Sequence, residues 1–235
     1  MPRLKLITFD LDNTLWDVRL VIGRAEKTMR NWLAEHAPLM STAYQDGTVD
    51  RARNALLREK PDIVHDLSQF RHQVLFRALQ QCGYAEDIAQ QHADTAFEIF
   101  YRARNDVVYF EGALETLAHL SQEYVLGALT NGNADIQMLG LQDVFSFHFS
   151  SASVGIGKPA PDMFHAALEH SGVAPSDAVH VGDSLTDDIH GASQVGMHSI
   201  WFNPGRSMRD ATIAPSAEIY LLTDLPAVIE AINGR

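Results

Sequence analysis

The sequence contains almost no cysteine and no long hydrophobic run. Cys82 is the single cysteine among 235 residues, so no disulfide can form within the chain. No apolar stretch approaches the roughly 20 residues that a membrane-spanning helix needs, and the N-terminal residues lack the apolar segment of a secretory signal. We therefore expect a cytoplasmic protein with no membrane partner.

Positive charge is scarce as well. Eighteen Lys and Arg residues stand against thirty Asp and Glu residues, which gives a formal net charge of -12. This sign opposes binding to nucleic acid, which carries dense negative charge, so we expect no nucleic-acid partner. A phosphate-bearing ligand would have to be neutralised locally by a few well-placed groups.

The composition that remains is that of a globular protein. Hydrophobic residues make up 46% of the chain and charged residues 20%, with 9 Pro and 15 Gly, which excludes intrinsic disorder and low-complexity sequence. A length of 235 residues suits one large domain or two small ones.

Short apolar segments alternate with amphipathic ones over much of the chain. Residues 4–12 are apolar and end in acidic and turn-forming residues, which is typical of a buried strand that leads into a loop. Further strands are expected at 124–130, 147–151, 178–182, 198–202 and 218–222. Between them, apolar residues recur at helical spacing, as in Leu114, Leu117 and Ala118. The alternation predicts an α/β fold, a Rossmann-like parallel sheet with helices on both faces.

The first connection between strands is too long for an ordinary crossover. A dozen or more residues suffice to join two parallel strands, yet residues 16–104 contain no convincing strand. Four apolar helical faces fall in this region, and four helices can bury such faces against one another. We predict a catalytic core formed by residues 1–15 and 106–235, with residues 16–105 inserted as an α-helical cap.

Acidic and polar residues follow several of the predicted strands. Asp10 and Asp12 are two residues apart, so a strand that continued this far would project both side chains from one face at its carboxyl end. The segments 130–132 (TNG), 158–159 (KP) and 182–184 (GDS) follow later strands or lie in the loops beyond them. An ordinary turn or an exposed lysine explains each segment alone. Their joint occurrence favours a common ligand site.

These segments resemble the motifs of the haloacid dehalogenase-like hydrolase superfamily, whose members are mostly Mg²⁺-dependent phosphatases. Residues 9–15 (FDLDNTL) resemble its first motif, 129–132 (LTNG) its second, 157–159 (GKP) its third and 181–189 (VGDSLTDDI) its fourth. The resemblance covers the whole chain and includes a helical cap after the first motif.

The resemblance implies an enzyme that hydrolyses the phosphomonoester of a small phosphorylated metabolite. Asp10 is implied as the nucleophile that forms an aspartyl-phosphate, and Asp12 as the group that donates and accepts protons. The implied cofactor is Mg²⁺, held by Asp10, the backbone carbonyl of Asp12 and Asp183.

Further roles are implied for the remaining motif residues. The implied phosphate-binding residues, of which the first and last also act in catalysis, are Thr130, Asn131, Gly132 and Lys158. The fourth motif leaves one choice open, because Asp187 and Asp188 occupy both positions at which family members place a second acid. The register of the following residues favours Asp188 as the residue that orients Asp183 and Lys158. Asp187 is then expected to be a solvated acid at a helix N-terminus.

Other functions stay open on the sequence alone. Dehalogenases of the superfamily typically lack an acid at the position of Asp12, so this residue favours phosphate chemistry. A phosphomutase is harder to exclude, since it keeps both acids. The alternative from a different class is a catalytically silent sensor that binds a phosphometabolite or a flavin.

Substrate specificity is expected to reside in the cap. The candidate contact residues, each equally explained as part of a solvated helical face, are Arg19, Arg51, His65, Asp66, Arg71 and Arg102. Residues 59–66, Arg71 and residues 131–134 resemble a bacterial branch that dephosphorylates flavin mononucleotide and 5-amino-6-(5-phospho-D-ribitylamino)uracil, which would place the protein in riboflavin biosynthesis. The expected oligomeric state is a monomer or a homodimer.

Overall fold

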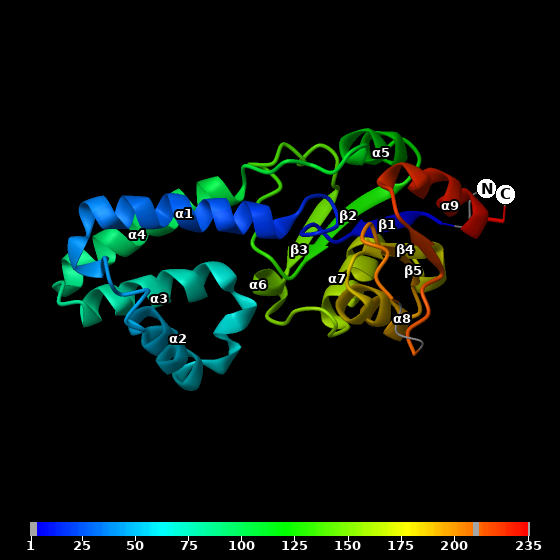
Figure 1. The fold of residues 1–235 in the computed structure, drawn as a ribbon. Coiled ribbons are helices and arrows are strands. Elements are labelled where there is room, and N and C mark those ends of the chain that lie inside the picture. Colours follow the sequence, from blue (N-terminus) through cyan, green and yellow to red (C-terminus); the bar gives the residue numbers. More distant parts are fainter. Residues whose placement is uncertain (1–3, 209–211, 235) are drawn as a thin grey trace. The chain divides into compact units, whose positions relative to one another are not determined.

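The computed structural model describes residues 4–208 and 212–234, and the chain divides into two compact units. One unit comprises Met1–Val18 and Val108–Arg235, and the other comprises Arg19–Val107. We call them the sheet unit and the helical unit; Figure 1 shows the elements of each.

The sheet unit is built on six parallel strands within the described residues. They are β1 (Leu6–Phe9), β2 (Val125–Thr130), β3 (Phe147–Ser150), β4 (Ala178–Gly182), β5 (His198–Phe202) and β6 (Ala217–Ile219). Their order is β3-β2-β1-β4-β5-β6, and every neighbouring pair is parallel. Every residue of β1 and β4 is buried, as expected for strands that are covered on both faces. The predicted α/β fold is confirmed.

Helices cover both faces of this sheet. They are α5 (Ala113–Leu120), α6 (Ser151–Val154), α7 (Asp162–Ser171), α8 (Gly191–Gln194) and α9 (Leu225–Ile232). Shorter turns are the 3-10 segments Pro175–Asp177 and Leu222–Asp224 and a π-helical turn, Leu185–His190. Figure 1 shows α7 and α8 on one face of the sheet and α5 and α9 on the other. Met163 and Phe164 of α7 pack with Leu6 and Leu129 in one buried cluster.

The apolar face predicted for α5 was partly wrong. Leu114 is 44% exposed and Ala118 is also exposed, whereas Leu117 is buried as expected. The buried face includes Thr116, whose hydroxyl donates to the carbonyl oxygen of Leu222 over 3.4 Å. A satisfied polar residue therefore lies on the core side, and the pattern of apolar residues alone gave the wrong helical face.

The helical unit has a hydrophobic core of its own. Its helices are α1 (Val18–His36), which begins at the boundary, α2 (Thr48–Glu59), α3 (Leu67–Gln81) and α4 (Glu86–Arg104), with 3-10 turns at Pro38–Met40 and Pro61–His65. Buried residues from all four helices form one cluster, for example Met29, Leu56, Leu79 and Phe100. Residues 16–104, in which no strand was predicted, contain none. Among the described residues of both units, no helix combines the length and apolar character that a membrane span requires.

Candidate active site

The candidate site lies where β1, β2 and β4 end at the same edge of the sheet. The strand β1 pairs with both neighbours, and Phe9 lies opposite Ala128 of β2 and Val181 of β4. Asp10 follows β1 directly, and its backbone N–H continues the pairing by donating to the carbonyl oxygen of Val181 over 2.8 Å. Residues that follow the three strands therefore converge, which is the usual ligand position in open α/β sheets.

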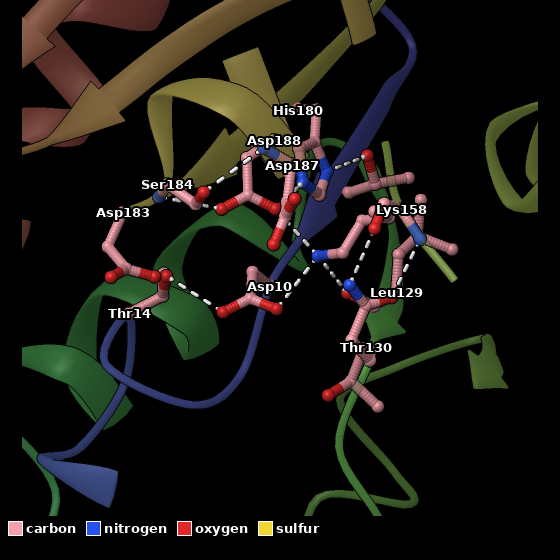
Figure 2. Close-up of polar contacts among 12 residues, drawn as sticks. Asp10, Thr14, Leu129, Thr130, Lys158, His180, Asp183, Ser184, Asp187 and Asp188 are labelled. Atoms are coloured by element: carbon pink, nitrogen blue, oxygen red, sulfur yellow. Dashed lines mark hydrogen bonds and ion pairs between the residues drawn. The ribbon is translucent and has the colours of Figure 1, made fainter. Parts of the chain in front are cut away.

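Lys158 is the centre of the polar network at this edge (Figure 2). Its Nζ donates to Asp10 Oδ1 over 2.8 Å, to Asp188 Oδ1 over 2.6 Å and to the carbonyl oxygen of Leu129 over 2.7 Å. The side chain is 1% exposed. Burial alone would lower the pKa of Lys158, but the two carboxylates outweigh it and raise this pKa. A fixed cation therefore stands beside the predicted nucleophile.

The backbone around Lys158 is held by the side chain of Asn131. Asn131 Nδ2 donates to the carbonyl oxygen of Lys158 over 2.8 Å, and Asn131 Oδ1 accepts from the Lys158 N–H over 2.7 Å. A Cβ atom at position 157 would lie 2.7 Å from this Oδ1, so the backbone can come this close to the Asn131 side chain only with glycine at position 157. The second and third motifs thus act as one unit that positions the lysine.

Asp188 is buried and accepts hydrogen bonds on both carboxylate oxygens. In addition to Lys158, His180 Nε2 lies 3.1 Å from Oδ1, and the Ser184 N–H donates to Oδ2 over 2.9 Å. Burial alone would raise the pKa of Asp188, but Lys158 and His180 hold it well below the usual range. Asp187, by contrast, is half-buried, and the Asp187 N–H donates to Ser184 Oγ over 3.0 Å. These contacts favour Asp188 as the acid that orients Lys158.

Three carboxyl groups gather at the site. Asp10, Asp183 and Asp188 each offer a carboxylate oxygen, and these oxygens lie within 4.8 Å of one another. Burial and the neighbouring Asp188 raise the pKa of Asp183 to about 7. Burial also raises the pKa of Asp10 well above its usual value, although Lys158 opposes the shift. The negative charge of the three carboxylates is therefore only partly balanced by positively charged groups of the protein.

This cluster fits a hard divalent cation such as Mg²⁺. Carboxylate oxygens are the ligands that Mg²⁺ prefers, and a cation would offset both the burial and the repulsion between carboxylates that raise the pKa values of Asp10 and Asp183. Asp10 and Asp188 each accept hydrogen bonds on both carboxylate oxygens, so this criterion does not separate them, and the ligand roles of Asp10 and Asp183 stay predictions. The loop that carries Asp183 is fixed by Trp201, whose indole N–H donates to the Asp183 carbonyl oxygen over 2.8 Å. The ligand role of the Asp12 carbonyl stays a prediction.

Asp10 and Asp12 do not project from one continuous strand. The strand β1 ends at Phe9, and the chain then turns, with Asn13 at a φ of 64°. Asp10 joins Lys158, and its Oδ2 accepts from the Thr14 hydroxyl over 3.2 Å. The half-buried Asp12 accepts from the indole N–H of Trp16 over 2.8 Å. The condition for the strand argument, that β1 continues to Asp12, is therefore not met, and the turn sets the directions of the two side chains.

Thr130 and Gly132 occupy the end of β2. Thr130 is fully buried, and its Oγ1 accepts from the Gly132 N–H over 2.9 Å. This bond holds the turn in a fixed shape next to the Leu129 carbonyl oxygen that binds Lys158. The phosphate contacts of Thr130, Asn131 and Gly132 stay predictions.

Several network residues were not predicted from the sequence. Thr8 and His180 are buried polar residues in otherwise apolar strands, which was the available signal, since such residues need partners. Thr8 Oγ1 and His180 Nδ1 lie 2.8 Å apart, and burial lowers the pKa of His180. Because Asp188 can only accept, we assign the ring proton to Nε2 and the donated proton at Nδ1 to the Thr8 hydroxyl. Trp16 and Trp201 carried no comparable signal.

Most of the predicted specificity residues have partners within the helical unit. Arg71 pairs with Glu26 over 3.1 Å and Arg102 with Glu98 over 2.6 Å. Arg51 Nη2 donates to Thr48 Oγ1 over 2.7 Å, and Asp66 Oδ1 accepts from the Gln69 N–H over 2.9 Å at the start of α3. Roles of these residues, and of Arg19 and His65, in substrate binding stay predictions.

The chain matches a known family over most of its length. The family described as haloacid dehalogenase-like hydrolase matches residues 4–196. The chain belongs to this family. The predicted membership is confirmed, and so is the prediction of a hydrolase.

The proteins to which this chain is similar include named phosphatases and a named dehalogenase. The chain is 33% identical over 233 residues to the 5-amino-6-(5-phospho-D-ribitylamino)uracil phosphatase YigB of Escherichia coli, covering 97% of this chain and 98% of that one. It is 30% identical over 256 residues to a glyceraldehyde 3-phosphate phosphatase of Pyrococcus furiosus, covering 99% and 95%. A crystal structure named 2-haloacid dehalogenase, from Pseudomonas syringae pv. Tomato DC3000, superposes with a TM-score of 0.94 at 46% identity, covering 97% and 99%.

Proposed function

We propose that the protein is a Mg²⁺-dependent phosphomonoesterase that acts on a small phosphorylated metabolite through an aspartyl-phosphate. The observation that carries the proposal is the buried acid cluster around Lys158, with a second acid, Asp12, two residues after Asp10. The phosphatase names of two relatives that span nearly the whole chain support it. We also propose that the helical unit is the cap that selects the substrate.

In the first step, a carboxylate oxygen of Asp10 attacks phosphorus. Lys158 holds Asp10 Oδ1, favours the ionised form against the effect of burial, and limits rotation of the carboxylate. As the ester bond breaks, Asp12 donates a proton to the leaving oxygen, and the alcohol departs. Mg²⁺ held by Asp10 and Asp183 would supply positive charge beside the phosphoryl oxygens.

In the second step, water hydrolyses the aspartyl-phosphate. Asp12, now ionised, accepts a proton from the water that attacks phosphorus. The bond between phosphorus and Asp10 breaks, which releases inorganic phosphate and regenerates the Asp10 carboxylate. Lys158 then stabilises that carboxylate again.

The test of this proposal is release of phosphate from p-nitrophenyl phosphate in the presence of Mg²⁺. We expect EDTA to abolish turnover and Asp10→Asn to abolish it at any Mg²⁺ concentration, whereas the exposed Asp143→Asn serves as an unaffected control. Robust turnover by purified Asp10→Asn would refute the role of Asp10. Ligand binding without turnover by the wild-type protein would favour the sensor alternative.

A second candidate function is the hydrolysis of 2-haloacids, because a 46% identical structure carries that name. Asp12 favours phosphate chemistry, since an attack on carbon needs no proton for the departing halide. The decision comes from one assay pair, phosphate release from a phosphomonoester and halide release from a 2-haloacid. Halide release without phosphate release would replace the phosphatase proposal.

For the substrate, we propose flavin mononucleotide or 5-amino-6-(5-phospho-D-ribitylamino)uracil. The E. coli relative named for the second compound supports this choice and a place in riboflavin biosynthesis. Values of kcat/KM for both compounds, compared with sugar phosphates and nucleotides, test it, and rates far below those of the other esters would contradict it. A cytoplasmic location and a monomeric or homodimeric state stay predictions.

A further inference from the structure

Trp16 is fully buried although it lies in the turn after β1. The turn is closed by backbone hydrogen bonds from Leu15 to Leu11 over 2.9 Å and from Asn13 to the carbonyl oxygen of Trp16 over 2.8 Å. The indole ring meets the ring of Tyr109 edge-on, with centroids 5.7 Å apart and an interplanar angle of 82°. The Tyr109 hydroxyl in turn donates to the carbonyl oxygen of Leu139 over 3.1 Å. The indole is therefore held in one orientation.

The one polar atom of this ring points at the predicted acid–base group. Trp16 Nε1 donates to Asp12 Oδ1 over 2.8 Å. An indole N–H is a donor only, so it can neither supply the catalytic proton nor accept one. A proton on Oδ1 would compete with this hydrogen bond, whereas a proton on Oδ2 leaves it intact. The contact thus distinguishes the two carboxylate oxygens.

We propose that Trp16 is a positioning residue that fixes the Asp12 carboxyl group with its proton on Oδ2, directed at the leaving oxygen of the substrate. The inference rests on the proposed phosphatase function and deepens it. In the first step, the ester bond from phosphorus to the leaving oxygen breaks and its electron pair stays on that oxygen. The same oxygen takes the proton from Asp12 Oδ2, while Asp10 forms the new bond to phosphorus.

The proposal makes a specific statement about leaving groups. An alkoxide is a poor leaving group and needs the proton as the bond breaks, whereas p-nitrophenolate is stable without one. Loss of the indole N–H should therefore impair alkyl esters and spare p-nitrophenyl phosphate. A merely structural role of Trp16 would impair both esters equally.

The experiment compares kcat/KM for p-nitrophenyl phosphate and glycerol phosphate in the wild-type protein and in Trp16→Phe. This parameter reports the steps up to transfer of the phosphoryl group to Asp10. We expect the alkyl ester to lose about tenfold to hundredfold and the aryl ester less than about threefold. The matched control, Trp32→Phe in α1, should leave the ratio of the two values unchanged.

A double-mutant cycle tests whether Trp16 acts through Asp12. In an Asp12→Asn background the acid is absent, so adding Trp16→Phe should cause no further loss with glycerol phosphate. If Trp16→Phe fails to fold, 3-benzothienylalanine at position 16 keeps the shape of the ring and removes only the N–H donor.

Equal losses for both esters, additive losses in the cycle, or an unchanged alkyl rate would each overturn the role of Trp16. A wild-type protein that hydrolyses neither ester would instead overturn the proposed function.

Discussion

Lys158 is a buried cation at the centre of a cluster of carboxyl groups. The whole chain carries a formal charge of -12, yet one buried ammonium group contacts both Asp10 and Asp188 at the site. Its side chain is 1% exposed, so solvent screens the pair only weakly. Lys158 therefore balances only part of the negative charge of the carboxyl cluster, and its three N–H donors are used by Asp10, Asp188 and the Leu129 carbonyl oxygen.

Removing this ammonium group should destabilise the fold and abolish activity. Lys158→Met leaves Asp10 and Asp188 buried without their shared cation, which typically costs about 3–5 kcal/mol of unfolding free energy. The measurement is urea unfolding in EDTA. The control is Lys5→Met, which breaks the exposed pair with Asp177 and should cost less than about 1 kcal/mol. Equal effects of the two substitutions would contradict the central role of Lys158.

Asp183 should make the metal-free protein less stable as the pH rises. Its pKa is raised from 3.8 to about 7 in the folded state, so the folded state binds more protons than the unfolded state between these values. Stability contributed by this group is therefore lost with increasing pH across that window and is constant above it.

The variant Asp183→Asn isolates this contribution. The difference in unfolding free energy between Asp183→Asn and the wild-type protein should shift in favour of the variant from pH 4.5 to about 7 and then level off. Urea unfolding in EDTA at several pH values measures it, with the exposed Asp143→Asn as a control. A difference that is independent of pH would contradict the raised pKa.

At the scale of elements, the site depends on how closely the end of β4 approaches the following π-helical turn. A Cβ atom at Gly182 would lie 2.2 Å from Asp188 Cγ. Gly182→Ala should therefore displace Asp188 from Lys158 and from the Ser184 N–H, with about a hundredfold loss of kcat/KM and 1–3 kcal/mol of stability.

The matched control for this substitution lies in α1. A Cβ atom at Gly23 meets nothing within 4 Å, so Gly23→Ala should stabilise the protein by about 0.5–1 kcal/mol and leave activity unchanged. Steady-state kinetics and thermal unfolding of both variants give the comparison. A normally active Gly182→Ala variant would show that Asp188 need not occupy its present position.

The elements were largely predictable from the sequence, because continuous apolar strands and helical periodicity report burial directly. The failures involve polar residues in the core. Thr116 lies on the buried face of α5, where the sequence pattern predicted only apolar residues. Thr8 and His180 belong to the polar network of the site although neither is part of a recognised motif. The shape of the turn after β1 could not be predicted from the sequence either. The different hydrogen-bond partners of Asp10 and Asp12, Thr14 and Trp16, therefore became evident only in the structure.

At the scale of the whole molecule, the chain combines two units that each have a hydrophobic core. Leu79 is fully buried in the cluster of the helical unit, and replacing it by alanine typically costs about 2–5 kcal/mol. We expect Leu79→Ala to lower the melting temperature of the helical unit more than that of the sheet unit, which calorimetry can measure. One transition that shifts as a whole would show that the two units unfold as a single cooperative structure.

The account depends most on transfer of the phosphoryl group to Asp10 before water attacks. Each transfer inverts the configuration at phosphorus, so hydrolysis of a thiophosphate ester that is chiral through oxygen isotopes, in isotopically labelled water, measures how many transfers occur. Two transfers predict net retention of configuration in the inorganic thiophosphate that is released. Net inversion would show that water attacks the substrate directly, and it would contradict an aspartyl-phosphate at Asp10.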